Sequence, residues 1–158
     1  MKTLISLMFG LSFVGTAYIT TPNEPNEPVK EEVVEVFSPE ALKNCIDSLG
    51  LKFPEIVMAQ ACLETGHFKS FIFRENNNLF GMRYPRKRPS ANIGKKHGYS
   101  LYKDWKQSVL DYSLYQSTYL SHINTQEEYL SYLKKHYAQD PKYLDKVKSL
   151  IKMYKIEG

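Results

Sequence analysis

The sequence has few of the residues that build metal sites and covalent cross-links. Its 158 residues include only two cysteines, four histidines and one tryptophan. No pair of histidines has a metal-ligand spacing such as H-x-x-x-H, and neither a phosphate-binding loop nor a dinucleotide-binding fingerprint is present. The sequence therefore predicts no metal site and no cofactor.

The one early apolar run is too short to predict a membrane span. The run, Leu4–Val14, follows a short positive start, Met1-Lys2, and a span needs about 20 apolar residues. Small residues, Gly15-Thr16-Ala17, follow at the positions that a signal peptidase reads, with no cysteine there for lipid attachment. We therefore predict a signal peptide at 1–17 and an exported protein, with an uncleaved N-terminal anchor as the alternative.

The segment after this run has little that it can bury. Residues 18–36 combine three prolines with several glutamates, which predicts a disordered acidic spacer. The folded domain is expected at 37–158, which is long enough for one hydrophobic core. Cys45 and Cys62 fall on successive predicted helices of this domain, where export permits a disulfide. Two buried thiols are the alternative.

Acidic residues are scarce in the middle of the chain. Between Thr65 and Gln126 only Glu75, Asp104 and Asp111 are acidic, whereas the same stretch has ten lysines and arginines. Such a basic segment suits an anionic polymer such as a bacterial cell wall, and it also suits nucleic acid. Ten of the twelve tyrosines follow residue 98, and their rings can pack in a core or line a carbohydrate groove.

The folded domain is predicted to be mainly helical. Helix-start signals and apolar periodicity predict helices at about 39–49, 56–65, 105–120 and 126–136, and a fifth after Asp140-Pro141. Residues 76–103 have no helical periodicity, and an alternating stretch at about 99–102 predicts a small β-hairpin. The predicted fold class is thus mainly α (α+β), a lysozyme-like helical domain with a small β-hairpin lobe.

Glu64 has the position of a candidate general acid. It follows Val57 and Ala61 at helical spacing, so its carboxyl group shares a face with apolar residues. It also lies in the last turn of its predicted helix, where the dipole disfavours a negative charge. Desolvation and the dipole both raise a carboxyl pKa, as acid catalysis near neutral pH requires. A partly exposed glutamate at a helix end is the alternative.

Four ordered motifs resemble those of one enzyme family. They are A-Q-A-C-L-E-T-G at 59–66 with Ser70 after it, N-N-L-F-G-M at 77–82, Y-x-x-W-x-x-S-x-x-D-Y at 102–112 and Y-A-Q-D-P-K-Y at 137–143. Together they resemble the glucosaminidase family of glycoside hydrolases, which includes bacterial autolysins and the muramidase domain of flagellar assembly proteins. The resemblance covers roughly residues 37–156.

The resemblance implies roles for residues at the matching positions. Glu64 is then the catalytic acid, and Tyr137 is the tyrosine that the family places near its acid, with Tyr143 as the second candidate. The implied substrate-binding residues are Asn77, Asn78, Phe80, Gly81, Tyr102, Trp105 and Tyr143. Asp111 is expected either to make a structural hydrogen bond or to serve the site, while Phe80 also suits core packing and Asp140 a helix cap.

One departure from the family bears on the reaction. Many members have a second carboxylate in the β lobe, yet residues 76–103 contain no aspartate or glutamate, and Asp104 is the nearest candidate downstream. We therefore expect substrate-assisted hydrolysis, in which the 2-acetamido group is the nucleophile, Glu64 acts as acid and then base, and Tyr137 orients the group. A lytic transglycosylase outcome is also compatible with one glutamate.

The implied function is that of an endo-β-N-acetylglucosaminidase acting on peptidoglycan glycan strands. An autolysin-like protein of the periplasm or cell surface is expected, a monomer that binds neither nucleic acid nor a small-molecule cofactor. A muramidase and an inactive wall-binding domain are the alternatives. A cysteine amidase is disfavoured, because Cys62 lies near a helix C-terminus, which raises a thiol pKa, and about 200° around the helix from Glu64.

Overall fold

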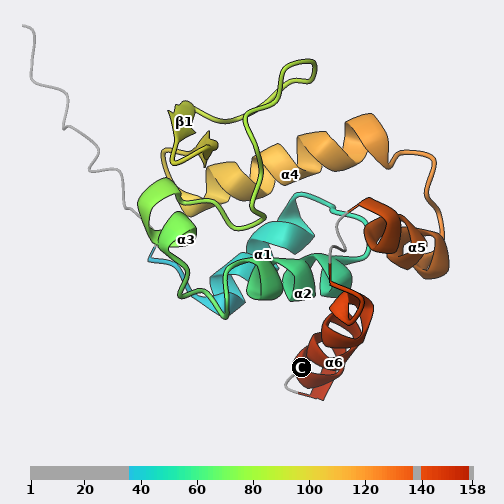
Figure 1. Cartoon of the computed structure of the whole chain (residues 1–158). Helices are drawn as coiled ribbons and strands as arrows, with labels where there is room; N and C mark the ends of the chain where they lie inside the picture. Colours follow the sequence, from blue (N-terminus) through green and yellow to red (C-terminus); the bar gives the residue numbers. More distant parts are fainter. Residues whose placement is uncertain (1–35, 137–139, 157–158) are drawn as a thin grey trace, which may run out of the picture. The chain divides into compact units, whose positions relative to one another are not determined.

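Helices and one β-hairpin make up the part of the chain that the structure describes. The structure is a computed structural model, and it describes residues 36–136 and 140–156. The elements are α1 (Pro39–Ser48), α2 (Pro54–Glu64), α3 (Phe71–Asn76), β1 (Gly94–Lys96), β2 (Tyr99–Leu101), α4 (Trp105–Tyr119), α5 (Gln126–His136) and α6 (Tyr143–Ile156). They confirm the predicted fold class, mainly α with a small β lobe (Figure 1). The predicted signal peptide and the spacer up to residue 35 lie outside the described residues.

Local capping explains where the predicted helices begin. Ser38 Oγ accepts a hydrogen bond of 3.0 Å from the Ala41 amide at the start of α1. Pro54 occupies the first turn of α2, where the missing amide hydrogen costs nothing. At the start of α5, Thr125 Oγ1 accepts a hydrogen bond from the Glu128 amide, and Glu128 Oε2 accepts one from the Thr125 amide. This reciprocal pair is the capping box that the sequence predicted.

The helix α2 is the central element of the domain. Seven of its eleven residues, Ile56–Cys62, are buried in succession, as in a helix that neighbours enclose on all sides. One apolar cluster joins α2 to α1 and α4, and a second joins it to α5 and α6. The C-terminal half of the described chain therefore packs around the helix that ends in Glu64, with α6 lying against α2 (Figure 1).

A short helix that the sequence analysis missed leads into the lobe. With six residues, α3 makes fewer than two turns, which is too short to show an apolar periodicity. Its local signal is Ser70, whose Oγ accepts a hydrogen bond of 3.1 Å from the Phe73 amide. A capped single turn of this kind depends on its tertiary surroundings for most of its stability.

The predicted β-hairpin follows α3. Strands β1 and β2 pair antiparallel, with Lys96 opposite Tyr99. Between them, His97 and Gly98 both have positive φ, 52° and 82°, the backbone that a two-residue hairpin turn requires. Asn76, the last residue of α3, donates a hydrogen bond of 2.7 Å to the Lys96 carbonyl. The hairpin is thereby tied to the helix before it.

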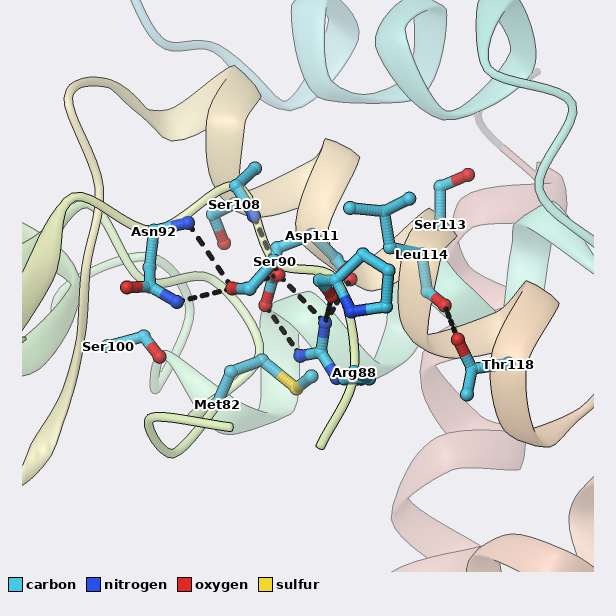
Figure 2. Close-up of polar contacts among 12 residues, drawn as sticks. Met82, Arg88, Ser90, Asn92, Ser100, Ser108, Asp111, Ser113, Leu114 and Thr118 are labelled. Carbon is cyan, nitrogen blue, oxygen red and sulfur yellow. Dashed lines mark hydrogen bonds and ion pairs between the residues drawn. The ribbon is translucent and has the colours of Figure 1, made fainter. Parts of the chain in front are cut away.

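A buried ion pair fastens the loop before the hairpin to α4. Arg88 and Asp111 meet at 2.7 Å, with side chains only 3% and 0% exposed. The Asp111 carboxylate also accepts hydrogen bonds from the Ser90 hydroxyl, the Ala91 amide and the Tyr102 hydroxyl. Figure 2 shows how Arg88 and Ser90 enclose it. Asp111 therefore has the structural role, one of the two that its sequence position allowed.

The two cysteines lie on α1 and α2, the successive helices that the sequence predicted for them. Cys45 is half-buried in α1, and Cys62 is buried in α2 with its Sγ 3.3 Å from Nδ1 of His67. Cys45 and Cys62 are not joined to each other by a disulfide in this structure. Within residues 36–136 and 140–156, no helix combines the length and apolarity that crossing a bilayer requires.

Candidate active site

Glu64 ends α2 with a carboxyl group that is partly buried. The hydroxyl of Tyr143, the first residue of α6, donates a hydrogen bond of 3.3 Å to Glu64 Oε1. Burial raises the pKa of the Glu64 carboxyl above its ordinary value, and the hydrogen bond from Tyr143 opposes that rise. Glu64 therefore keeps its proton to a higher pH than an exposed glutamate, as a general acid must.

Tyr143 is a neutral partner for this acid. Its side chain is only 6% exposed, and burial together with the negative charge of Glu64 raises the pKa of the Tyr143 hydroxyl far above its ordinary value. The hydroxyl thus stays protonated and able to donate at any pH where the protein works. The sequence named Tyr143 as a substrate-binding candidate, and the structure brings it to the predicted acid.

Gly81 places backbone against the other side of the same carboxyl group. It has a φ of +61°, and a Cβ at this position would lie 3.5 Å from Glu64 Oε2. The carboxyl group therefore has the Tyr143 hydroxyl at one oxygen and the main chain of the N-N-L-F-G turn at the other. Three of the predicted site residues, Glu64, Gly81 and Tyr143, meet in space although they come from three separate motifs.

The asparagines of that turn hold its backbone in shape. Asn78 is 1% exposed, and its Nδ2 donates to the carbonyl groups of Met82 and Ser100 at 2.9 Å and 3.0 Å. Asn77 ends α3 in the left-handed conformation (φ 54°) and donates to the Tyr102 carbonyl at 3.1 Å. Both side-chain amides are thus used inside the protein, and hydrogen bonds from them to a sugar stay a prediction.

Three aromatic candidates lie in the core beside the turn. Phe80 is 1% exposed and stacks on Tyr112 with ring centroids 4.1 Å apart. Tyr102 is 1% exposed and Trp105 6%, the latter packed edge-on against Phe37. Rings buried to this degree leave too little surface for a sugar to stack on. Phe80, Tyr102 and Trp105 thus pack in the core of this structure, and their predicted substrate contacts stay a prediction.

The two carboxylates downstream of the lobe, those of Asp104 and Asp111, are both engaged within the protein. Asp104, the nearest downstream carboxylate, accepts a hydrogen bond of 2.9 Å from the Gln107 amide and so caps α4. Asp111 is held by Arg88. Tyr137, the predicted partner of the acid, lies outside the described residues. Across the described ranges, no group of three or more His, Cys, Asp or Glu side chains is placed to hold a metal ion.

One polar residue beside the acid was missed from the sequence. Gln60 lies one helical turn before Glu64 and is fully buried. Its Oε1 accepts a hydrogen bond of 2.8 Å from the Tyr112 hydroxyl. Gln60 stands in the A-Q-A-C-L-E-T-G motif, which is the signal that marks it. Its partners lie on α4 and α5, so its role was not readable from neighbouring residues.

Two known proteins match this chain in sequence over part of their lengths. Protein bax of Escherichia coli is 34% identical over 103 residues, which are 65% of this chain and 35% of that protein. An N-acetylmuramoyl-L-alanine amidase domain-containing protein of Staphylococcus aureus is 28% identical over 128 residues, which cover 66% of this chain and 21% of that protein. The chain thus spans about a third and a fifth of the lengths of these relatives.

The fold is also similar to a solved structure. The catalytic domain of the autolysin Auto from Listeria monocytogenes superposes with a TM-score of 0.53 and 20% sequence identity, covering 75% of this chain and 82% of that one. At this identity the likeness concerns the fold.

A family model covers the whole site. The family described as mannosyl-glycoprotein endo-beta-N-acetylglucosaminidase, or glucosaminidase, matches residues 42–156. This range contains the acid, the Gly81 turn and the Tyr143 hydroxyl that the structure brings together. The motifs that suggested the resemblance therefore lie inside the matched range, and the chain belongs to the glucosaminidase family of glycoside hydrolases.

Proposed function

We propose that the chain is an exported peptidoglycan hydrolase that cleaves the glycan strand at N-acetylglucosamine, as an endo-β-N-acetylglucosaminidase. Family membership supports cleavage of a glycosidic bond at this sugar. The Listeria neighbour is named as an autolysin, and the S. aureus relative is named for an N-acetylmuramoyl-L-alanine amidase domain. Both names point to the bacterial cell wall as the substrate. The observation that carries the proposal is the partly buried carboxyl group of Glu64, held between the Tyr143 hydroxyl and the Gly81 backbone.

Glu64 acts in this proposal as the acid that frees the leaving group. Its proton passes to the glycosidic oxygen as the bond between that oxygen and C1 breaks. Two-carboxylate hydrolysis places the second carboxyl group about 5–5.5 Å or about 6.5–9.5 Å from the first. The two downstream candidates, Asp104 and Asp111, are engaged in a helix cap and an ion pair, which favours a nucleophile from the substrate.

The proposed nucleophile is the 2-acetamido oxygen of the N-acetylglucosamine unit. It attacks C1 as the glycosidic bond breaks, and a water molecule then opens the cyclic intermediate while the Glu64 carboxylate takes the water's proton. Tyr137 is proposed to orient the acetamido group. Tyr143 remains hydrogen-bonded to Glu64 and stabilises the carboxylate that exists between the first proton transfer and the second.

The surface charge of the lobe supports an anionic polymer as partner. Arg83, Arg86, Lys87 and Lys95 are all exposed in the segment that carries the hairpin. Basic groups of this kind attract an anionic polymer such as the cell wall. The proposal therefore places the protein in the periplasm or at the cell surface, as a monomer that binds glycan strands without a cofactor.

The test is digestion of purified peptidoglycan followed by mass spectrometry of the reduced soluble fragments. The wild-type chain should release fragments that end in reduced N-acetylglucosamine, and Glu64→Gln should release none. Glu55→Gln makes the same change at an exposed position in the first turn of α2 and is the matched control. It should retain wild-type activity.

Other products would assign a different activity. Fragments that end in reduced N-acetylmuramic acid would make the protein a muramidase, and anhydro-muramic acid ends would make it a lytic transglycosylase. If wild type and Glu64→Gln both bind the wall and release nothing, the chain is a wall-binding domain and the proposal fails.

A further inference from the structure

A continuous line of buried polar groups begins at the loop after α1. The Lys52 amide donates to Gln116 Oε1 at 2.9 Å, and Gln116 Nε2 donates to the Lys52 carbonyl at 3.1 Å. Gln116 Nε2 also donates to the Tyr129 hydroxyl oxygen at 3.0 Å. The hydroxyl groups of Tyr129 and Tyr112 meet at 2.7 Å, and that of Tyr112 donates to Gln60 Oε1 at 2.8 Å. The line thus joins α4, α5 and α2.

The hydrogen bonds between Lys52 and Gln116 fix which atoms donate and which accept at the start of this line. Because the backbone of Lys52 fixes the amide of Gln116, the Tyr129 oxygen must accept from Nε2. The Tyr129 hydrogen then points either to Tyr112 or to Gln60 Oε1, which lies 3.3 Å from the Tyr129 hydroxyl, and the Tyr112 hydrogen points to Gln60 Oε1. With Oε1 accepting, the free end of the Gln60 amide is its Nε2 donor.

That donor end is the unusual feature. Gln60 is 0% exposed, and in the described part of the chain its Nε2 has no hydrogen-bond partner that meets ordinary geometry. Buried polar atoms in folded proteins nearly always have a partner, and one that lacks it calls for an explanation. A hydrogen-bond acceptor is therefore expected near Gln60 Nε2.

The group beside this donor is the hydroxyl of Tyr143. Gln60 and Glu64 are one turn apart, so their side chains share a face of α2, and α6 packs against α2. Tyr143 starts α6 and donates to Glu64 Oε1 at 3.3 Å. Burial raises the pKa of the Tyr143 hydroxyl, and the Gln60 amide, donating toward its oxygen, opposes that rise. The hydroxyl thus donates to Glu64 on the face of α2 that also carries the unpartnered Gln60 Nε2.

We propose that Gln60 is a positioning residue whose Nε2 holds the Tyr143 oxygen and so directs the Tyr143 hydrogen to Glu64. Its effect on turnover rests on the proposed function, whereas its effect on the Glu64 proton needs no substrate. Aligned hydrogen bonds polarise one another, so each member strengthens the next. Through these hydrogen bonds, the fixed backbone of Lys52 orients each side chain in turn, up to the Tyr143 hydroxyl that donates to Glu64.

Few titratable groups surround the Glu64 carboxyl group in the described part of the chain. Among the described residues, the titratable groups around the Glu64 carboxyl are Tyr143 from α6 and, behind Gln60, the hydroxyls of Tyr112 and Tyr129. Gly81 adds backbone alone. Gln60 is thus placed to act on Glu64 through Tyr143, and a substitution of Gln60 should change the pKa of the Glu64 carboxyl group.

The test is an NMR titration of the Glu64 carboxyl carbon in the full-length chain. Gln60→Met keeps the side-chain volume and removes the donor, so the Glu64 pKa should rise because Tyr143 loses its fixed orientation. Tyr143→Phe should raise it further. In the double variant the pKa should equal that of Tyr143→Phe, since the effect of Gln60 passes through the hydroxyl.

Activity and stability give a second readout. Gln60→Met should lower kcat about 10-fold to 100-fold, as misplaced catalytic groups do, with KM little changed and the basic limb of the pH profile moved upward. Leu42→Ala removes packing from a fully buried residue of α1 outside the line. It should lower Tm while leaving the Glu64 pKa unchanged, which separates positioning from lost stability.

Two titration results would overturn the proposal. Either the Glu64 pKa is unchanged in Gln60→Met, or Gln60→Met raises it by the same amount in the presence and absence of the Tyr143 hydroxyl. Should Gln60→Met not fold, the pair Tyr112→Phe and Tyr129→Phe removes the hydroxyls that orient the amide, and the same criteria apply. If wild type cuts no peptidoglycan but the titrations agree, the proposed function fails and the positioning role stands.

Discussion

At the residue scale, Glu64 sits where the protein opposes its ionisation. Burial raises the pKa of its carboxyl group, and the one hydrogen bond from Tyr143 opposes this rise without cancelling it. A group whose folded-state pKa is raised favours the folded state when protonated, and that advantage is lost as the pH rises above its unfolded pKa. The carboxyl group that we propose as the catalytic acid is therefore a source of instability at neutral pH, a trade-off common at active sites.

Replacement of Glu64 by Gln should expose this cost. We expect Glu64→Gln to raise Tm at pH 7, which lies above the unfolded-state pKa of the wild-type carboxyl group, and to have little effect below about pH 4, where both side chains are neutral. The same change should reduce activity by about 10²-fold to 10⁴-fold, the contribution of a general acid. Thermal melts across pH measure the first effect. A Tm that falls at pH 7 would contradict the assigned pKa direction.

Gly81 offers a test of how closely the turn must approach the acid. Its φ of +61° costs an L-residue about 1–2 kcal/mol, and a Cβ would come within 3.5 Å of Glu64 Oε2. Gly50 has the same φ of +61° with nothing within 4 Å of a Cβ. Gly81→Ala and Gly50→Ala should therefore lose similar stability in urea unfolding, while only Gly81→Ala raises the Glu64 pKa and slows hydrolysis. Equal effects of both variants on activity would show that the approach is unimportant.

At the scale of elements, the ion pair of Arg88 and Asp111 fixes the lobe to α4. Burial alone would raise the pKa of Asp111, but the hydrogen bonds from Arg88, Ser90 and Tyr102 hold it below its ordinary value. A depressed pKa contributes stability that is present above the unfolded pKa and is lost as the pH falls through the folded one. The attachment of the lobe should accordingly weaken in acid.

Asp111→Asn should be strongly destabilising, because it leaves the Arg88 charge buried without a counter-ion. We expect a loss of about 3–5 kcal/mol in urea unfolding at pH 7, and a smaller difference from wild type in acid. The same substitution at Asp47, whose pair with Lys43 is exposed, should change stability by less than about 1 kcal/mol. A loss at Asp111 no larger than at Asp47 would contradict the anchoring role.

Elements with local start signals were the predictable ones. Ser38 and Pro54 mark α1 and α2 in the sequence, and the structure confirms both starts. The helix α3 was missed, since its six residues are too few for a periodic pattern. Within the site, Glu64 followed from its motif and helix position. The line through Gln60 was not predictable, because Tyr112 and Tyr129 reach it from helices whose packing the sequence does not state.

At the scale of the whole molecule, charge is unevenly distributed. The chain has a formal net charge of +4 at pH 7, and residues 76–103 contain no aspartate or glutamate. The exposed cations of this segment include Arg83, Arg86, Lys87 and Lys95. Arg88 of the same segment is instead buried in its ion pair with Asp111. The others remain available for a long-range attraction that salt screens over about 10 Å at 0.1 M.

Adsorption to purified cell walls should therefore depend on salt. We expect it to fall as the NaCl concentration rises, and to fall at low salt in the double variant Arg86→Glu and Lys87→Glu. The matched control, Lys134→Glu with Lys135→Glu, makes the same charge change on α5, outside the lobe, and should adsorb almost as wild type. Pelleting with sacculi measures both. Equal losses in the two double variants would assign the attraction to net charge alone.

The contact between α2 and α6 also orders events during synthesis. Glu64 ends α2, whereas Tyr143 begins α6, the last element of the described chain. On the ribosome, the acid is translated long before the hydroxyl that orients it, and α2 has no α6 to bury its apolar surface. A nascent chain that stops short of Tyr143 therefore has Glu64 but not its working environment. In the proposed mechanism, an unfinished translation product therefore lacks the hydroxyl group that hydrogen-bonds its acid.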